Sequence, residues 1–386
     1  MAGVASLPPD MLANIHCRLL FLDRLSFAAV FPAARAAFKP EAPWLILHGG
    51  DTSESATLFS LSDQRAAAAC APGADQVILG SSSHGWLVVA DEKAQLRLIN
   101  PVTGERRMLP AITTIPCLID NGFNFTMVQQ KYFVKGPPYP GGGDRPSLAT
   151  YTVRADLMRR FFYRKVVLSD SAAMMVTGTR FGIPAFATAG GGAWKMAPSR
   201  DGIEDAINHN GKFHSITYAG AVEVWEQDAD ADGVFRSAVI APKLLPLPAD
   251  ADHRKYLVVA PDGRLMVVLE DSKETWDVCC RRRRACSFKV YVLVGEQWKE
   301  TDDIGESVLF VGVNGSLCVS TMQHPELRAG CVYYTENDVG LCNDLHKHEQ
   351  SGIGVYSLKD GTVEKVEGLG RHRSWPPPAW FIPFIP

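Results

Sequence analysis

The sequence has no long apolar run, little net charge and no catalytic motif. No stretch of the 386 residues approaches the roughly 18 consecutive apolar residues that a membrane span needs. The opening residues, MAGVASLPPD, lack the basic and apolar segments of a secretory signal. The nine cysteines are scattered and odd in number, which favours free thiols over a disulfide framework. We therefore expect a protein of the cytoplasm or the nucleus.

The charges and the reactive side chains exclude further function classes. The formal net charge is only -3, so no overall basic field attracts nucleic acid. The sequence contains no nucleophile elbow, zinc-protease motif, P-loop or dinucleotide-binding glycine motif. The acidic pairs Asp91-Glu92 and Asp302-Asp303 fall in expected turns, where carboxylates favour turn geometry. We therefore expect no enzyme and no cofactor.

Metal-ligating residue types occur, but their spacing matches no usual zinc site. They form two groups, Cys279, Cys280 and Cys286 in the first and Cys331, Cys342, His346 and His348 in the second. Structural zinc sites combine short, regularly spaced ligand pairs, and neither group has this pattern. We expect no metal site here and interpret these residues as loop cysteines and solvated histidines.

Four consecutive arginines occupy positions 281–284. Such a run is compatible with a nuclear import signal or with a surface for an acidic partner. The alternative is a solvated insert in a hairpin between Val268 and Phe288, because four like charges repel one another and resist burial. No aromatic residue is interleaved with the arginines, so nucleic-acid binding is not expected.

The sequence does contain a repeated pattern of short strands and tight turns. Residues 80–110 show it best, with apolar runs at 86–90, 96–99 and 108–109 that are each too short for a helix. The turns between these runs contain Asn100-Pro101 and Thr103-Gly104, whose residues suit tight turns. The stretch predicts an antiparallel sheet.

The same pattern recurs almost to the end of the chain. Further hairpin signals occur at Asn210-Gly211, Ala219-Gly220, Pro261-Asp262-Gly263, Gly295-Glu296 and Asn314-Gly315. Alanine-rich residues 64–71 differ, and we interpret them as a short helix or a loop. Closely spaced strands without a long helix indicate a mainly β sandwich, barrel or propeller. Recurrence over about 40 to 50 residues favours a multi-bladed β-propeller of about six or seven blades.

Residues 7–38 follow a helical period instead. Leu12, Ile15 and Leu19 recur at helical spacing, and a second apolar set begins at Leu25. The expected helix signals are Pro8-Pro9-Asp10 for the first helix, Asp23 as the cap of the second and Pro32 at the start of the third. Such short helices cannot bury their apolar faces alone, so they need a partner surface in this chain or in another protein.

This helical stretch resembles the F-box, the module through which substrate receptors dock on the Skp-type adaptor of a cullin-RING ubiquitin ligase. The resemblance rests on residues 7–12, Ile15, Arg18-Leu19, residues 23–27, Val30 and Arg35. It implies that the adaptor contact, or the packing behind it, comes from Leu7, Pro8, Leu12, Ile15, Leu19, Leu25 and Val30. F-boxes usually carry Cys and then Trp where this chain has Phe31 and Ala34. A helical cap on the β domain is therefore the alternative.

The rest of the chain resembles the KIB-type β-propeller domain of plant F-box proteins. The matching stretches are residues 80–110, 210–213, 298–300, 309–312, 314–316, 331–335 and the tail 375–381, WPPPAWF. They follow one another in the expected order from residue 44 to the end. The two resemblances imply an F-box-like helical module in residues 1–40 and a KIB-type β-propeller domain in residues 41–386.

Together the resemblances imply a substrate receptor of an SCF-type cullin-RING E3 ubiquitin ligase. Its expected partners are the Skp-type adaptor, through which it joins the cullin-RING ligase, and an unknown target protein bound by the propeller; neither membrane nor nucleic acid is expected. The alternative is a propeller that acts as a protein-binding scaffold, with a degenerate F-box that does not dock. A propeller enzyme is a third possibility, but no constellation of reactive residues supports it.

Overall fold

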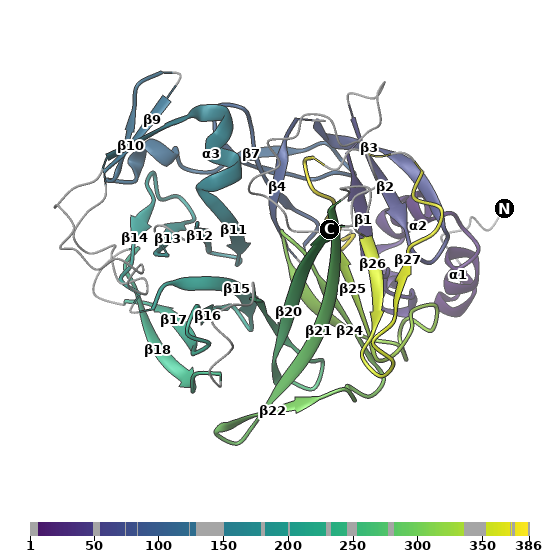
Figure 1. The fold of residues 1–386 in the computed structure, drawn as a ribbon. Coiled ribbons are helices and arrows are strands. Elements are labelled where there is room, and N and C mark those ends of the chain that lie inside the picture. Colours follow the sequence, from purple (N-terminus) through teal and green to yellow (C-terminus); the bar gives the residue numbers. More distant parts are fainter. Residues whose placement is uncertain are drawn as a thin grey trace.

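A computed structural model describes most of the chain, namely residues 7–48, 55–73, 75–82, 84–122, 124–128, 150–178, 182–199, 201–228, 233–244, 253–276, 282–335, 353–370, 372 and 375–384. Small sheets follow one another around a ring, and the N-terminal helices lie at one edge of it (Figure 1).

Three short helices precede the sheets: α1 (Pro9–His16), α2 (Phe21–Val30) and the 3-10 helix η2 (Pro32–Ala37). Proline starts α1 and η2, as expected, because its missing N–H needs no partner in a first turn. The predicted cap at Asp23 is wrong, since α2 already begins at Phe21. Asp23 lies instead in the first turn of α2, where its negative charge interacts favourably with the helix dipole.

The described strands form six sheets of four or five strands, which we number as blades in chain order, and one smaller side sheet. Blade 1 contains β28 (Ala379–Phe381), β1 (Trp44–Leu47), β2 (Ser55–Ser60) and β3 (Arg65–Gly73), and blade 2 contains β4 (Val77–Ser81), β5 (Leu87–Ala90), β6 (Leu96–Ile99) and β7 (Arg106–Met108). Blade 3 contains β11 (Tyr163–Leu168), β12 (Ala172–Thr177), β13 (Pro184–Thr188) and β14 (Lys195–Met196), and blade 4 contains β15 (Ile203–His209), β16 (Lys212–Thr217), β17 (Val222–Gln227) and β18 (Phe235–Ala241).

The last two blades are followed by the closing strand β28. Blade 5 contains β19 (His253–Val259), β20 (Leu265–Trp276), β21 (Arg282–Val294) and β22 (Gln297–Thr301), and blade 6 contains β24 (Ser316–Ser320), β23 (Ser307–Val311), β25 (Cys331–Thr335), β26 (Ile353–Ser357) and β27 (Val363–Lys365). The side sheet contains β8 (Leu118–Asp120), β9 (Asn124–Val128) and β10 (Thr150–Arg154), and the short helices η3 (Ile112–Thr114) and α3 (Ala155–Phe161) flank it.

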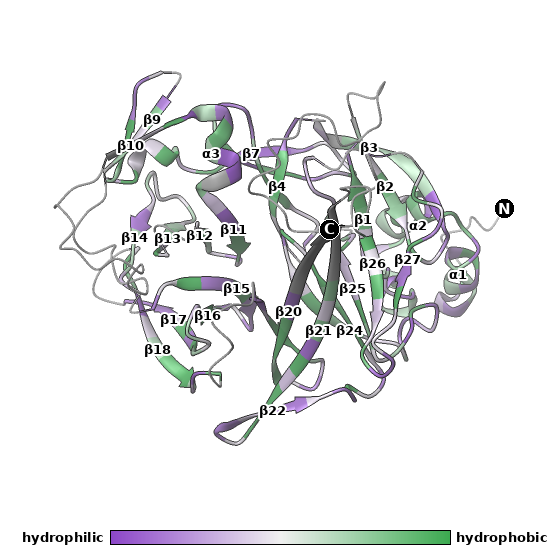
Figure 2. Cartoon of the chain, in the orientation of Figure 1, coloured by the Kyte–Doolittle hydropathy of each residue, from purple (hydrophilic) through white to green (hydrophobic). Residues whose placement is uncertain are grey.

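The apolar faces of the blades cover one another. In the part of the chain that the structure describes, a cluster of buried hydrophobic side chains lies between each blade and the next, including between blade 6 and blade 1. Hydrophilic residues gather on outer strands such as β14, β22 and β27 (Figure 2). This burial is the main force that holds the blades together.

The ring closes over six blades, with the side sheet outside it. Phe125 and Met127 of the side sheet join the apolar cluster between blades 2 and 3. The inner strands of these two blades nevertheless touch directly, because a Cβ on Gly80 of β4 would lie 1.9 Å from the carbonyl oxygen of Val166 in β11. The side sheet is therefore an insertion rather than a seventh blade.

The chain ends close the ring. Strand β28 pairs antiparallel with β1, with Trp44 opposite Phe381. Asn314 of blade 6 clamps β28, because its amide nitrogen donates to the carbonyl of Trp380 at 2.7 Å and its amide oxygen accepts from the Trp380 N–H at 3.0 Å. The sequence resemblance in residues 375–381 thus falls on the closing strand.

Two sequence interpretations change. Residues 64–71 contribute most of the strand β3 rather than a helix or a loop. Their alanines pair with β2, and Ala69 is buried in the cluster between blades 1 and 2, so tertiary burial overrides the weak strand preference of alanine. Blade 2 also begins earlier than predicted, with β4 as a fourth strand ahead of the runs that the sequence indicated.

Candidate functional site

The helical module, residues 7–38, is anchored on blade 1 by apolar contacts and a buried charge. Phe21 packs edge-on against Trp44, with ring centroids 4.6 Å apart, and Leu25 joins the same cluster. The Arg24 guanidinium donates to both oxygens of Glu41 at 2.5 and 2.9 Å and to both oxygens of Asp63 at 3.2 and 2.7 Å. These bidentate hydrogen bonds fix the orientation of the side chains and also balance their charges.

The predicted adaptor residues fall into two groups. Leu12 and Leu25 are buried, with 4% of each side chain exposed, so they pack the module. Leu7, Ile15 and Leu19 are half-buried, and Pro8 and Val30 are exposed. The structure therefore divides the predicted set into packing residues and residues that can reach a partner.

The module also exposes large apolar side chains. The exposed fractions are 50% for Met11, 47% for Leu20 and 68% for Val30. The helical period of the sequence does not indicate Leu20, because this residue lies in the link between α1 and α2. Phe31, one of the departures from the F-box pattern, is half-buried and packs on Phe27 at 4.6 Å, and Ala34, the other, is buried.

A second concentration of functional groups lies at the inner strands of the propeller. We call it the axial cluster, and it consists of Arg164 and Lys165 in β11, Glu204 and Asp205 in β15, and Arg254 and Lys255 in β19. These dipeptides occupy the second and third positions of their strands in blades 3, 4 and 5. Equivalent positions on neighbouring inner strands lie at the same level, so six charged residues meet there.

The lysines of the axial cluster neutralise its carboxylates. Lys165 Nζ donates to Asp205 Oδ1 at 2.7 Å, and Lys255 Nζ donates to Glu204 Oε2 at 2.5 Å. Burial lowers the pKa of Lys165, and the adjacent Asp205 carboxylate opposes that shift. The recurring pairs Arg-Lys, Glu-Asp and Arg-Lys are visible in the sequence, but they do not indicate a cluster until the positions of the strands in the blades are known.

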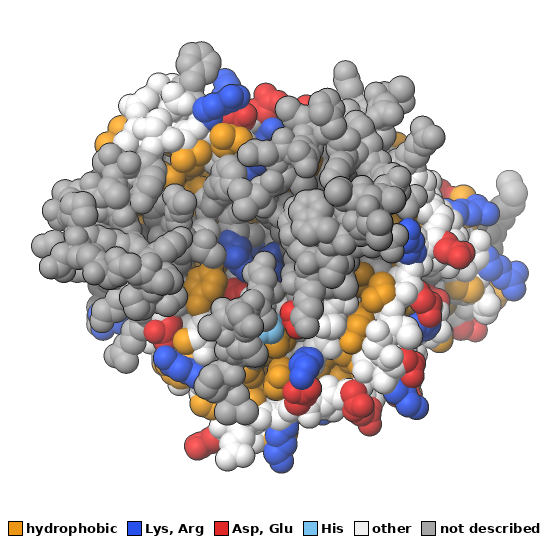
Figure 3. Space-filling view, viewed as in Figure 1, with side chains coloured by type: hydrophobic (Ala, Val, Ile, Leu, Met, Phe, Trp, Pro, Cys, Tyr) orange, Lys and Arg blue, Asp and Glu red, His pale blue; other side chains and the backbone are white. Residues whose placement is uncertain are grey.

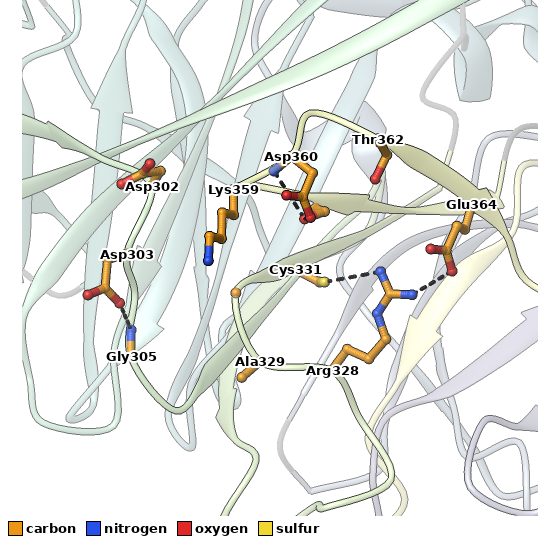
Figure 4. Close-up of a pocket in the computed structure, with 12 residues that line it drawn as sticks. Asp302, Asp303, Gly305, Arg328, Ala329, Cys331, Lys359, Asp360, Thr362 and Glu364 are labelled. Atoms are coloured by element: carbon orange, nitrogen blue, oxygen red, sulfur yellow. Dashed lines mark hydrogen bonds and ion pairs between the residues drawn. The ribbon is translucent and has the colours of Figure 1, made fainter.

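A polar pocket of about 840 Å³ lies beside blade 6. Its lining comes from the link after β22, the link before β25 and the turn between β26 and β27, and Lys359 points into it (Figure 4). Arg328 donates to Glu364 at 2.5 Å and to the Cys331 sulfur at 3.7 Å. The pocket can hold a polar group, but Cys331 is buried and hydrogen-bonded, which argues against a nucleophilic role.

Most of the cysteines and histidines that the sequence analysis considered, and rejected, as metal ligands lie outside the described residues. Cys279, Cys280, Cys342, His346 and His348 belong to that part, whereas Cys286 and Cys331 are in β21 and β25. Within the described ranges, no group of three or more His, Cys, Asp or Glu side chains could hold a metal ion. Burial raises the pKa of both Cys117 and Cys318 to about 11, so these thiols stay protonated at neutral pH.

Two further features of the sequence, the acidic turn at Asp91 and the arginine run, can be located in the structure. Asp91 is a turn residue, as predicted, because its carboxylate accepts the N–H groups of Lys93 and Gln95 at 2.9 Å. In the arginine run, position 281 lies outside the described residues, and positions 282–284 begin β21, which pairs with β20 in the expected hairpin between Val268 and Phe288. No described helix is long and apolar enough to cross a membrane.

Comparisons with known proteins agree with this architecture. Residues 58–357 match the family described as the KIB1-4 beta-propeller. The Arabidopsis thaliana F-box protein SKIP23 is 22% identical, with 98% of this chain and 96% of that protein covered. The Arabidopsis thaliana F-box protein KIB4 is also 22% identical, with 93% and 88% covered.

Solved structures give a looser match. The β-propeller domain of Myceliophteria thermophila Cps50 (Swd1) is 10% identical, covers 67% of this chain and 82% of its own, and superposes with a TM-score of 0.34, which is too low to compare sites. The family match, in contrast, runs from β2 to the end of β26 and includes strands of all six blades. The chain therefore belongs to the KIB1-4 beta-propeller family.

Proposed function

We propose that this protein is the substrate-receptor subunit of an SCF-type cullin-RING E3 ubiquitin ligase. In this proposal residues 1–40 form an F-box that docks on the Skp-type adaptor, and residues 41–386 form a propeller that binds the target protein. The relatives that cover nearly the whole chain are named F-box proteins, which supports this assignment. The protein would work in the nucleus or the cytoplasm.

One observation carries the proposal. The helical module is locked onto blade 1 on one side, while Met11, Leu20 and Val30 remain exposed. Large apolar side chains on a short helical module cost free energy in water unless a partner covers them. An adaptor that covers these side chains together with Leu7, Pro8, Ile15 and Leu19 would complete their burial.

The proposal needs no catalytic residue in this chain. A receptor that holds its target beside the ligase raises the effective concentration of target lysines near the activated ubiquitin. No cofactor or metal is required for that task. The propeller only has to bind the target and keep it in place.

Co-purification with a plant Skp-type adaptor tests the docking half of the proposal. Deleting residues 1–40 would also uncover the apolar face of blade 1 around Trp44, so single surface changes are more informative. We expect the wild-type chain to bind stoichiometrically and Val30→Asp and Leu20→Asp to weaken binding at least about tenfold, because each places a charge in an apolar contact.

The matched control is Val239→Asp. Val239 is 62% exposed on β18 of blade 4, across the molecule from α1 and α2 (Figure 1). This variant should bind the adaptor as the wild-type chain does. If the wild-type chain fails to bind, the second candidate function gains support: a propeller scaffold whose F-box no longer docks, with Phe31 and Ala34 at the positions that differ.

A further inference from the structure

The axial cluster has more positive groups than its own carboxylates can neutralise. Four cationic side chains, from two arginines and two lysines, meet the carboxylates of Glu204 and Asp205. Glu270 is the other carboxylate that acts on Arg254, and it accepts from the Tyr256 hydroxyl at 2.7 Å and from the Cys286 thiol at 3.7 Å. The cluster remains positive even when Glu270 is counted.

Both carboxylates of the cluster already accept a hydrogen bond on each oxygen. Glu204 accepts from the backbone N–H of Lys255 at 3.0 Å in addition to the Lys255 ammonium. Asp205 accepts from the backbone N–H of Leu257 at 2.9 Å besides the Lys165 ammonium. The Ser316 hydroxyl lies 3.3 Å from Asp205 and donates to the Leu257 carbonyl at 2.7 Å. The two arginines contribute none of these hydrogen bonds.

The two arginines of the cluster make few hydrogen bonds. The Arg164 guanidinium donates through Nε to the carbonyl oxygen of Glu204 at 2.7 Å and is 3.7 Å from the Glu204 carboxylate through Nη2. Arg254 is half-buried with its guanidinium 5.1 Å from the Tyr256 ring, and it donates no hydrogen bond to any residue that the structure describes. An arginine carries five N–H donors, and unpaired donors away from bulk water are costly.

A third donor lies at the same place. The Tyr218 hydroxyl, just after β16, is buried and has no hydrogen-bond partner among the described residues. The Arg164 guanidinium lies 5.9 Å from the Tyr218 ring, and both Arg164 and Arg254 act on the pKa of Tyr218, which burial raises. Three donors from blades 3, 4 and 5 therefore lie near one another with unused hydrogen-bonding capacity.

Solvent reaches the cluster at Arg164 and Arg254, which are partly exposed, whereas its lysines and carboxylates are buried. The Arg164 side chain is 19% exposed, and Figure 3 shows Lys or Arg side chains recessed near the centre of the face toward the viewer. A recessed, partly desolvated positive site attracts anions more strongly than an exposed one, because the surrounding protein has a lower dielectric constant than water.

We infer that the axial cluster binds a phosphate group through Arg164, Arg254 and the Tyr218 hydroxyl. A phosphate presents oxygens in several directions, which suits donors that arrive from three blades, and arginine forks match its geometry. The phosphate could belong to a phosphorylated side chain of a protein or to a small phosphate ester. Phosphate binding at this site does not depend on adaptor docking, so each of the two proposals can be refuted without the other.

The test is titration calorimetry on the purified full-length chain, first with inorganic phosphate and then with phenyl phosphate, at constant ionic strength in chloride. We expect saturable binding at one site per chain. Tyr218→Phe removes only the unpartnered hydroxyl, so it should weaken phosphate binding at least about threefold without lowering the melting temperature in phosphate-free buffer. Arg254→Gln should weaken binding at least about tenfold.

Matched controls use the same substitutions at the surface of blade 5. Arg264→Gln and Tyr291→Phe change residues that pair with Asp262 and Glu300. Both controls should bind phosphate as the wild-type chain does. The inference is overturned if the wild-type chain shows no saturable binding, or if Tyr218→Phe and Arg254→Gln bind phosphate unchanged. Should Arg254→Gln fail to fold, Tyr218→Phe decides alone.

A further arm identifies the source of the phosphate. The affinities of a library of phosphoserine and phosphothreonine peptides are measured. They are compared with the affinities of the same peptides without phosphate and with the affinity of phenyl phosphate. Phosphate-dependent peptide binding that is tighter than that of phenyl phosphate assigns the site to a modified protein partner. Peptide binding no tighter than that of phenyl phosphate assigns it to a small ester, and both outcomes support a phosphate site.

Discussion

The propeller and the helical module bury their apolar surface in different ways. Each blade covers the next around a closed ring, so most of the apolar surface of the propeller is buried between blades. The helical module buries Phe21 and Leu25 on blade 1 but leaves Met11, Leu20 and Val30 in solvent. The contrast indicates that the propeller buries its apolar surface mainly within the chain, whereas the module leaves large apolar side chains exposed.

Charged side chains are paired differently at the junction between the module and blade 1 and in the axial cluster of the propeller. At the junction between the module and blade 1, each carboxylate oxygen of Glu41 and Asp63 accepts a hydrogen bond from Arg24. In the axial cluster, donors of Arg254 and Tyr218 remain unused among the described residues. Complete pairing is typical of a structural contact, and unused donors are typical of a binding site.

The largest expected effect comes from breaking the junction. Arg24→Met leaves the carboxylates of Glu41 and Asp63 largely buried without their cation, so we expect a loss of about 3 to 5 kcal/mol in the free energy of unfolding. Urea unfolding followed by tryptophan fluorescence measures it. The control is Arg328→Met, which breaks an exposed pair with Glu364 and should cost no more than about 1 kcal/mol. Equal losses would contradict a structural junction.

A smaller loss is expected from opening the ring. Asn314→Ala removes both hydrogen bonds to the Trp380 backbone at a position where only 1% of the residue is exposed, so it should cost about 1 to 3 kcal/mol. Thermal unfolding measures the change. Asn121→Ala, which removes a surface hydrogen bond to Thr126, is the control and should change stability by less than about 0.5 kcal/mol. A stable Asn314→Ala protein would mean that strand pairing alone closes the propeller.

The sequence predicted much of this fold and less of its sites. Hairpin turns such as Asn210-Gly211 are local signals, and they located strands correctly because turn geometry depends on a few neighbouring residues. The strand at 65–73 could not be predicted, since alanine has little strand preference and only the contact with β2 holds it.

Site residues depended on information that is not local. Helical spacing placed Leu12 in a first apolar set and Val30 in the set that begins at Leu25, but it could not say that Leu12 is buried and Val30 is exposed. Burial depends on how the helices pack in the folded chain. Likewise, Arg164 and Arg254 are 90 positions apart in the sequence, and only the equivalent places of β11 and β19 in the ring bring them to one site.

Acid should loosen the helical module. Burial lowers the pKa of His16 below its usual value of 6.5, and the ring stacks on Phe38 at 4.4 Å. Because burial disfavours the charged ring, the unfolded chain takes up a proton at His16 more readily than the folded chain. The stability that neutral His16 contributes is therefore complete above pH 6.5 and is lost as the pH falls toward the pKa of His16 in the folded chain. Melting temperatures between pH 7.5 and 5.5 measure this loss.

The matched variants assign the effect to His16. His16→Phe keeps a stacked ring but cannot be protonated, so its melting temperature should fall less than that of the wild-type chain over this pH range. His84→Phe, at a side chain that is 53% exposed, should leave the wild-type pH dependence in place. An unchanged pH dependence in His16→Phe would assign the acid sensitivity to other groups.

The smallest stability effect is expected where the module and the propeller both expose valine. Val30→Asp and Val239→Asp change side chains that are 68% and 62% exposed, so each should alter the free energy of unfolding by no more than about 0.5 kcal/mol. Urea unfolding tests this equality, and a clearly larger loss for Val30→Asp would show that Val30 supports the fold. If the two variants are equally stable and only Val30→Asp loses adaptor binding, the exposed apolar surface of the module serves a partner and not the fold.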